Sequence, residues 1–259
     1  MTDTPALAII YEDEDLLVID KPAGITVNRA ETTKHEMTVQ DWAEEKLKIE
    51  KGESQVDKES DFYKRSGIVH RIDKETSGVL LIAKNSEAFI NLQQQFKDRV
   101  VKKTYIALVH GKMTPEAGEI NVPVGRLPWN RKRFGIVPGG RESLTRYKVL
   151  KYYISSPYKT KTQEPMTLLA LYPQSGRTHQ IRVHLKYLNH PIFSDSLYAG
   201  RKTSRNDRKI LPRVFLHAAE ITFTHPRTGK TMTFASPLPQ MLENVLQRFT
   251  VREAYKLYS

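Results

Sequence analysis

The order of strand-like segments narrows the folds open to this chain more than any other feature. The acidic turn Glu12-Asp13-Glu14-Asp15 separates two short apolar runs, and the turn at 225–230 separates two more, which predicts two hairpins. Residues 79–83 are apolar on both faces, as in a central strand. Since long βαβ alternation is absent, we expect an α+β fold with a mixed, mainly antiparallel central sheet flanked by helices. The predicted strands are residues 7–11, 16–20, 79–83, 103–109, 118–124, 143–151, 166–172, 214–223 and 232–234.

Helices are predicted where a capping residue precedes apolar residues at helical spacing. Thr38 caps a helix that runs to Lys48, and Asn85 caps the next. Two more are expected at 181–188 and 239–249. Residues 50–64 are charged and nearly free of apolar side chains, so we interpret them as a mobile surface insertion. The 259 residues suffice for one large domain of two tightly joined lobes, which is the organisation we expect.

Composition and charge limit the kinds of partner. The chain has no cysteine, which excludes disulfides and thiolate zinc sites. Residues 1–63 hold 7 Lys+Arg and 16 Asp+Glu, whereas residues 64–259 hold 34 and 13, so a strongly basic body follows an acidic start. That body indicates a polyanionic partner, most simply nucleic acid. Because we find no leader, no membrane-length apolar run and no basic amphipathic helix, we expect a cytoplasmic protein without a membrane partner.

The segment 68–84 places a single aspartate, Asp73, in a short polar loop. The cationic pair His70-Arg71 precedes it, and Thr76-Ser77-Gly78 leads into an apolar strand. A carboxylate in such a loop can act as base or nucleophile, and Arg71 can meet a phosphate or stack on a base. The plain alternative is a turn, because Asp, Thr, Ser and Gly are common turn formers.

A second motif at 175–185 opens a helix with a glycine turn. Its first turns carry Arg177, His179 and Arg182, and a helix N-terminus favours a nearby phosphate or carboxylate. Arg182 can pair bidentately with a carboxylate, and Asp73 is the candidate. For Arg177 the alternative is a solvated surface charge. We interpret His184 as a core histidine with its hydrogen bonds satisfied.

Other residues point to RNA contact. Tyr105, next to basic residues on a strand, is either core or a platform for an unpaired base. Two basic stretches, 126–134 and 201–209, are expected to be loops, and the first mixes cations with aromatics as single-strand binders do. The histidines follow no metal-binding pattern, so no metal site is predicted. The cations singled out in these stretches are Arg131, Lys132, Arg133, Arg201 and Lys202.

Taken together, the motifs resemble a known family, the RluA-type pseudouridine synthases. The family isomerises chosen uridines in structured RNA to pseudouridine, in a cleft across its sheet and without cofactor or metal. The resemblance implies that Asp73 is the catalytic aspartate, that Tyr105 packs on the target base and that Arg182 pairs with the aspartate. It also implies that Arg71 fills the gap left by the flipped base. The matching segments are 16–24, 70–78, 103–105, 176–184, 216–219 and 225–226, which together span about residues 7–240.

The chain departs from many relatives in leaving no room before Leu7 for a separate N-terminal RNA-binding domain. The basic stretches are then expected to determine which RNA the protein binds. Ribosomal and transfer RNA are both open as substrates. The protein is expected to be a monomer. One alternative is an RNA-binding or ribosome-maturation factor that keeps the fold and does not depend on turnover. A metal-dependent nuclease would need clustered carboxylates, in which residues 64–259 are poor.

Overall fold

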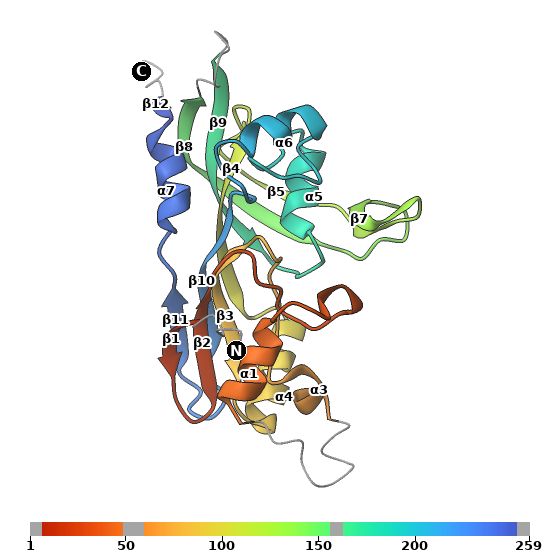
Figure 1. Ribbon diagram of the computed structural model, residues 1–259, viewed down its shortest axis with the longest axis vertical. Helices are drawn as coiled ribbons and strands as arrows, with labels where there is room; N and C mark the ends of the chain where they lie inside the picture. Colours follow the sequence, from red (N-terminus) through yellow and green to blue (C-terminus); the bar gives the residue numbers. More distant parts are fainter. Residues whose placement is uncertain (1–6, 49–59, 156–162, 253–259) are drawn as a thin grey trace. The chain divides into compact units, whose positions relative to one another are not determined.

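The computed structural model describes residues 7–48, 60–155 and 163–252. The chain divides into two compact units, which we call the first unit (residues 1–102 and 218–237) and the second unit (residues 103–217 and 238–259). Figure 1 shows their helices and strands. Among the described residues, no helix is both long and apolar enough to cross a membrane.

The sheet of the first unit contains both predicted hairpins. Its strands lie in the order β1-β2-β3-β10, and β11 pairs with β10 (Figure 1). The pairs β1–β2, β2–β3 and β10–β11 are antiparallel. Every residue of β3 is buried, which confirms the central strand. The strands are β1 (Ala8–Glu12), β2 (Leu16–Lys21), β3 (Ser77–Ala83), β10 (Leu216–Thr224, whose first two residues belong to the second unit) and β11 (Thr231–Ala235).

The described residues of the first unit also form the helices α1 (Val39–Lys46), α3 (Asp61–Arg65) and α4 (Ser86–Lys97). Both predicted caps are confirmed, since Thr38 accepts a hydrogen bond from the Asp41 N–H and Asn85 accepts one from the Ala88 N–H. A short 3₁₀ turn covers Glu31–Thr33. Helix α4 packs on β3 and contacts α3.

The charged insertion predicted at 50–64 lies partly outside the described residues, which resume at Ser60. From Asp61 onward the prediction is wrong, because α3 is ordered and buries Phe62 edge-on against Phe89, with ring centroids 5.9 Å apart. One buried aromatic ring therefore anchors an otherwise polar helix to the core.

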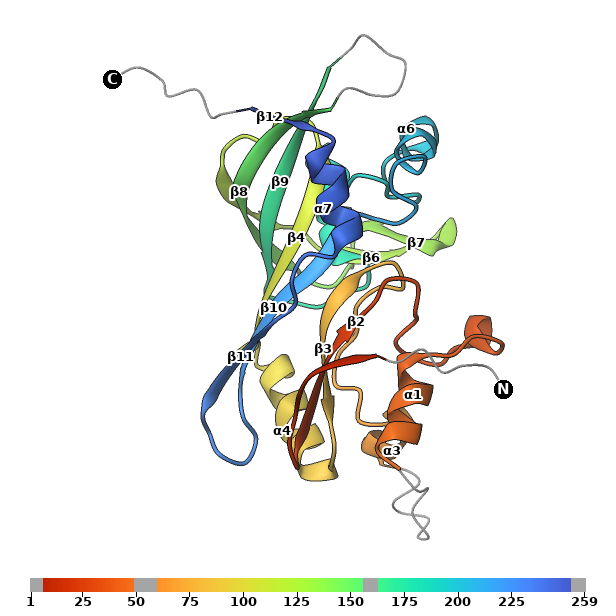
Figure 2. The ribbon, with the colours of Figure 1, turned by 60° about the vertical axis from the view of Figure 1, so that its left-hand side comes forward.

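The second unit is built on antiparallel strands in the order β4-β9-β8-β12, with β5 paired to β8. A separate hairpin, β6–β7, projects beside α5 in both views (Figures 1 and 2). Helix α7 contributes Leu242 and Val245 to the core of this unit. The expected mainly antiparallel sheet flanked by helices is confirmed. The elements are β4 (Lys102–His110), β5 (Ala117–Asn121), β6 (Val124–Leu127), β7 (Asn130–Ile136), β8 (Leu144–Ser155), β9 (Glu164–Pro173), β12 (Thr250–Arg252), α5 (Gln180–Tyr187), α6 (Arg201–Asp207) and α7 (Gln240–Gln247).

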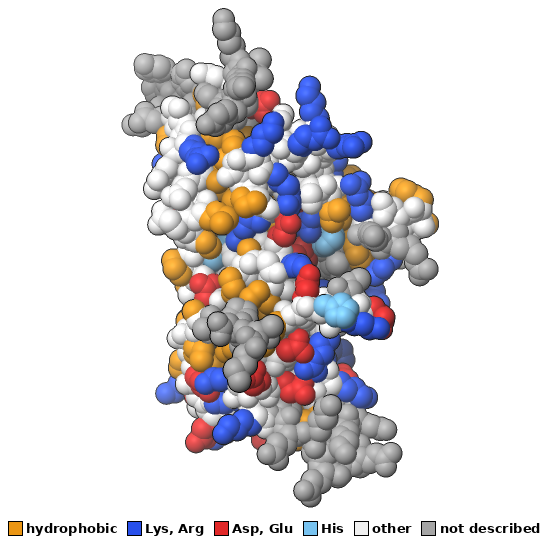
Figure 3. Space-filling view, viewed as in Figure 1, with side chains coloured by type: hydrophobic (Ala, Val, Ile, Leu, Met, Phe, Trp, Pro, Cys, Tyr) orange, Lys and Arg blue, Asp and Glu red, His pale blue; other side chains and the backbone are white. Residues whose placement is uncertain are grey.

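Both basic stretches are regular structure, so their prediction as loops is wrong. Residues 126–134 belong to the β6–β7 hairpin, and the strand expected at 118–124 divides between β5 and β6. Residues 201–207 form α6, which begins after Gly200 at φ 84° and turns Ser204 and Asp207 inward. Its cations point outward, and Figure 3 shows Lys and Arg side chains gathered over this helix. A short polar helix of this kind has two buried side chains, both polar, so hydrophobic periodicity in the sequence does not predict it.

Candidate active site

Asp73 lies half-buried in the loop between α3 and β3 of the first unit. Hydrogen bonds to the main-chain carbonyls of Asp73 and Lys74 hold this loop. The Lys74 carbonyl accepts from the Gly24 N–H (2.7 Å) and from the Lys21 ammonium (3.3 Å), and the Thr76 N–H donates to the Asp73 carbonyl (3.0 Å). The position of Asp73 is thus set by its neighbours' main chain, while Arg71 beside it is exposed.

Lys21 is completely buried and joins the turn after β2 to the Asp73 loop. Besides Lys74, its Nζ donates to the carbonyls of Pro22 (2.8 Å) and Ile25 (2.9 Å). A buried ammonium is costly unless hydrogen bonds satisfy it, and these carbonyls do so. Lys21 belongs to the segment 16–24 of the family resemblance, and its contact with the Asp73 loop could not be predicted from that segment.

Gly78, at the end of the loop motif, has a structural requirement of its own. Its φ is +117°, which L side chains rarely adopt, and a Cβ there would lie 2.1 Å from the Ala218 carbonyl oxygen. The absence of a side chain lets the start of β3 approach β10 closely. The glycine therefore fixes where the Asp73 loop joins the sheet.

His70 has a structural role within the first unit. Its ring stacks on Phe96, with centroids 4.8 Å apart, and its Nε2 accepts a hydrogen bond from the Leu81 N–H at 2.9 Å. That bond uses the Nε2 lone pair, so the ring is neutral in this arrangement, in contrast to the cationic His-Arg pair of the sequence prediction.

In the second unit, Arg182 of α5 is buried and held by a carboxylate that no sequence motif indicated. Its Nε and Nη2 donate to the two oxygens of Asp195 at 2.7 and 2.9 Å. The guanidinium also lies over the Tyr198 ring, 5.1 Å from its centroid. Bidentate pairing and stacking together fix both the position and the plane of the guanidinium.

Asp195 is itself held by the turn that follows it. One of its carboxylate oxygens accepts the N–H groups of Leu197 (2.9 Å) and Tyr198 (3.1 Å). An aspartate that accepts from the residues two and three positions ahead is typical of Asx turns. That spacing, Asp195 followed by Tyr198, is the sequence signal that could have indicated a structural aspartate here.

The Tyr198 hydroxyl connects the beginning of α5 to the β6–β7 hairpin. It accepts from the Phe134 N–H at 3.2 Å and lies 2.9 Å from His179 Nδ1. The His179 ring meets both Phe134 and Tyr198 edge-on, and its backbone is left-handed at φ 57°. His179 therefore has partners within the unit, and an RNA contact for it stays a prediction.

Tyr105 lies half-buried on β4, opposite Leu171 of β9, and packs against the core of the second unit. The ring thus has one side in the core, as one of the two interpretations expected. Two residues before it, burial lowers the pKa of Lys103 to about 8, and its Nζ lies 3.4 Å from the Ser175 carbonyl.

The remaining predicted cations occupy several places. Arg177 is half-buried and its Nε lies 3.4 Å from the Glu142 carbonyl. Arg133 is half-buried in β7, and Arg131 and Lys132 belong to the same strand, their side chains lying outside the description. Arg201 and Lys202 are exposed in the first turn of α6. The second unit therefore groups most of the predicted cations around α5 and the hairpin, while Asp73, His70 and Arg71 belong to the first unit.

His184 confirms the prediction of a satisfied core histidine. It is fully buried, with Nδ1 2.9 Å from Thr145 Oγ1 and Nε2 3.2 Å from the Val122 carbonyl. Burial lowers its pKa to about 4, against the weaker opposing effect of the Val122 carbonyl. The ring is therefore neutral at physiological pH.

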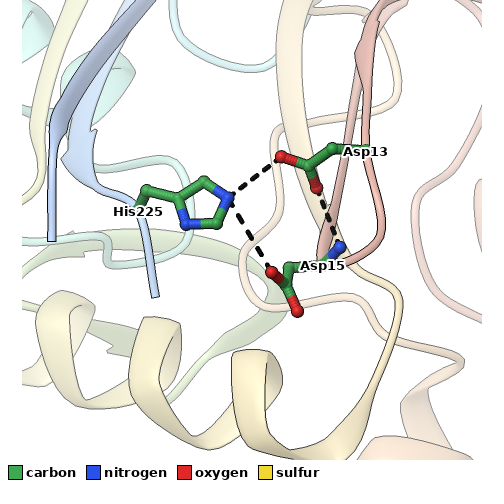
Figure 4. Close-up of side chains that lie close together, drawn as sticks. All are labelled: Asp13, Asp15 and His225. Carbon is green, nitrogen blue, oxygen red and sulfur yellow. Dashed lines mark hydrogen bonds and ion pairs between the residues drawn. The ribbon is translucent and has the colours of Figure 1, made fainter. Parts of the chain in front are cut away.

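Within the described residues, one group has the spacing of metal ligands: Asp13, Asp15 and His225 (Figure 4). Its hydrogen bonds show a structural clasp. His225 Nδ1 accepts from the N–H groups of Arg227 and Thr228, both at 3.2 Å, so Nε2 carries the proton that it shares with Asp13 at 2.9 Å. Neither ring nitrogen then offers a lone pair to a cation.

The two carboxylates of the clasp are also engaged. Asp15 accepts from Arg227 and Asn85 at 2.7 and 2.9 Å. Burial alone would raise the pKa of Asp13, but hydrogen bonds from Tyr11, the Asp15 N–H and His225 outweigh it and lower the pKa to about 2. The clasp ties the β1–β2 turn to the β10–β11 turn.

The fold and the sequence motifs together indicate the protein family to which this chain belongs. The model of the RNA pseudouridylate synthase family matches residues 15–187, and the chain belongs to that family.

Individual proteins with similar sequences or structures give a more specific comparison than the family model. The chain is 38% identical over 245 residues to Ribosomal large subunit pseudouridine synthase D of Nitrosomonas europaea, covering 93% of this chain and 64% of that protein. It is 35% identical over 248 residues to the protein of the same name from Neisseria meningitidis serogroup B, covering 93% and 60%. The chain thus spans less than two thirds of the length of these two relatives. Among solved structures, Human RNA Pseudouridylate Synthase Domain Containing 1 is similar with a TM-score of 0.70 and 25% identity, over 97% of this chain and 92% of that one.

Proposed function

We propose that this protein is an RNA pseudouridine synthase, an isomerase that converts chosen uridines in structured RNA to pseudouridine without a cofactor. The main support is the Asp73 loop, which carries a half-buried carboxylate and is held in place at the Lys74 carbonyl by the Gly24 N–H and the Lys21 ammonium. Membership of the RNA pseudouridylate synthase family gives that carboxylate a chemistry.

In the proposed reaction, Asp73 supplies the carboxylate that reacts with the target nucleotide. The N-glycosidic bond breaks, the uracil turns, and a carbon–carbon bond to the ribose forms, so no atom is gained or lost. Tyr105 packs on the uracil and Arg182 pairs with Asp73. A guanidinium fixed in advance by Asp195 costs little reorganisation when the substrate binds.

The target base must leave its helix before Asp73 can reach it. Extrusion of a base costs a few kcal/mol, on the order of one stacking and pairing interaction. We assign Arg71 to the gap left by the base, because its side chain is exposed beside Asp73. The cations of the hairpin and of α6, with Arg177 and His179, offset the cost by binding phosphates.

We propose ribosomal RNA as the substrate, in preference to transfer RNA, because relatives 35–38% identical carry the name ribosomal large subunit pseudouridine synthase D. We place the activity in the cytoplasm, where ribosomes are assembled and where a chain without cysteine needs no oxidising environment.

Replacing Asp73 with Asn tests the proposal. The substrate is ribosomal RNA purified from cells that lack the protein. On this RNA we expect the variant to form pseudouridine at least about a hundredfold more slowly than the unmodified protein, because the reacting carboxylate is gone. Affinity for that RNA should be retained. Pseudouridine mapping and a binding titration measure the two quantities.

Asp98→Asn is the matched control, because Asp98 is exposed in the same unit and the change in charge is identical. It should leave both activity and affinity at the level of the unmodified protein. Normal pseudouridine formation by Asp73→Asn would contradict the proposal and favour an RNA-binding factor that does not depend on turnover.

A further inference from the structure

A second candidate binding site lies wholly within the second unit. It is a pocket of about 380 Å³ between the β6–β7 hairpin, the turn at 137–141 and the residues that precede α5. This volume is in the range of small-ligand sites. Within the described part of the chain, the residues proposed as catalytic are not among those that line it.

The lining of this pocket is strongly cationic. Arg126, Arg141 and Arg177 come from three different segments, and the described lining residues include Thr178 but no Asp or Glu. Three arginines in the lining of one pocket attract an anion to it. The guanidinium fork matches the geometry of phosphate as well as of carboxylate, and phosphate is the anion that the proposed RNA substrate carries.

Glycines make the close packing behind the pocket possible. A Cβ at Gly125 would lie 2.5 Å from Val137 Cγ2, and one at Gly140 would lie 3.0 Å from the Val137 carbonyl oxygen. Val124 and Arg141 exchange two backbone hydrogen bonds, both 3.0 Å, which join β6 to the turn. This backbone fixes the Cα atoms from which Arg126 and Arg141 extend, so the pocket is preformed.

The same hairpin offers aromatic surface to a nucleotide. The Arg126 guanidinium lies over the Phe134 ring at 5.2 Å, and both residues line the pocket. Trp129, at the hairpin tip, is 79% exposed. Exposed aromatic rings beside cations are typical of proteins that stack unpaired bases.

We propose that this pocket is a phosphate subsite for an unpaired RNA nucleotide outside the catalytic centre, held by Arg126, Arg141 and Arg177. The inference rests on the proposed function, because it assigns the pocket to the same RNA substrate. It adds Arg141, which no motif singles out, to the residues that hold the RNA.

Arg141→Gln tests the subsite with a short single-stranded oligouridylate as the probe. We expect its affinity to fall by about tenfold to a hundredfold, since one charge-assisted contact is lost. The slope of log affinity against log salt should decrease by about 1. Arg146→Gln is the matched control, because Arg146 is exposed on β8, pairs with Glu119 and lies outside the pocket.

A second probe separates phosphate binding from base stacking. On the methylphosphonate analogue of the oligouridylate, which lacks backbone charge, Arg141→Gln and the unmodified protein should bind equally. An equal loss on both probes would overturn the assignment to phosphate. Affinity and salt slope of Arg141→Gln equal to those of Arg146→Gln would overturn the subsite itself.

Filling the pocket gives an independent test that leaves charge unchanged. A Cβ at Gly176 meets nothing within 4 Å, and this glycine is not among those with positive φ, so Gly176→Val is compatible with the fold. We expect it to weaken oligouridylate binding as Arg141→Gln does, with an unchanged thermal unfolding midpoint; unaltered binding would count against the pocket. The proposed function is tested separately, because it fails if Asp73→Asn still forms pseudouridine. The oligouridylate titrations of the two pocket variants do not bear on that result.

Discussion

Asp73 and Arg182, which the proposed reaction pairs, are held by opposite means. In the first unit, main-chain carbonyls and N–H groups fix the Asp73 loop, helped by the buried Lys21. In the second unit, side chains fix Arg182, through the carboxylate of Asp195 and the ring of Tyr198. The backbone of the loop sets the position of the carboxylate, whereas the guanidinium depends on partners from another segment.

This difference determines how each region responds to substitution. A loop held by several weak main-chain bonds loses one bond at a time. A buried ion pair loses its balance at once, because the remaining charge is left without compensation. The second region should therefore be the more sensitive to a single change.

Asp195→Ala should have the largest effect. We expect the free energy of unfolding to fall by about 3–5 kcal/mol, because the Arg182 guanidinium stays buried and loses the bidentate Asp195 carboxylate. Pseudouridine formation should fall as well. Denaturant unfolding and product mapping measure the two effects.

Asp195→Asn sharpens the result, since it can still accept from the turn N–H groups but lacks the charge. If the loss follows from the charge, Asn should recover only part of the stability. A loss below about 1 kcal/mol for the alanine variant would show that side chains do not hold Arg182 as described.

Lowering the pH should have the next largest effect, and it should destabilise the second unit before the first. His184 in the second unit has a pKa of about 4, below the 6.5 of a free histidine, so its contribution is complete above pH 6.5 and is lost as pH falls toward 4. Asp13 in the first unit, at about 2 instead of 3.8, loses its contribution only below pH 3.8. We expect the second unit to lose up to about 3 kcal/mol between pH 6.5 and 4.

Hydrogen exchange, corrected for the intrinsic rate at each pH, measures this order directly. Protection of α5 should decline before that of the β1–β2 hairpin. Equal decline in both elements would contradict the assignment.

Lys21→Met should have the smallest effect on stability. The near-isosteric change leaves the carbonyls of Pro22, Ile25 and Lys74 without the ammonium, and we expect a loss of about 1–3 kcal/mol. Pseudouridine formation should decrease because the Asp73 loop is less constrained. Thermal unfolding and product mapping measure both effects, with the exposed Lys97→Met as the control. If Lys21→Met costs more than Asp195→Ala, the comparison between the two regions is reversed.

Much of the fold could be predicted because local signals agreed with tertiary packing. The apolar run that became β3 and the caps at Thr38 and Asn85 each specify structure within a few residues. Helices α3 and α6 were missed because their stability comes from a few inward contacts, such as Phe62, and from no periodic pattern. Hairpin β6–β7 was missed because its charged sequence hides the strand alternation.

The residues of the candidate site show the same difference between local signals and long-range contacts. The contiguous motif around Asp73 could be recognised, and so could the core role of His184. Asp195 was missed because its partner Arg182 lies thirteen positions earlier, on another element, and sequence spacing carries no sign of a buried ion pair. Lys21 was missed for a related reason, since a lysine is ordinarily exposed and its carbonyl partners lie in the turn after β2 and in a distant loop.

The first unit is discontinuous in sequence: residues 218–237 supply β10 and β11 to a sheet that residues 1–102 begin. During synthesis, the β1–β2–β3 segment therefore leaves the ribosome well before the strand that covers its edge. Its completion must wait until the second unit's strands have been made, which gives the nascent chain a long-range closing step and an exposed edge in the meantime.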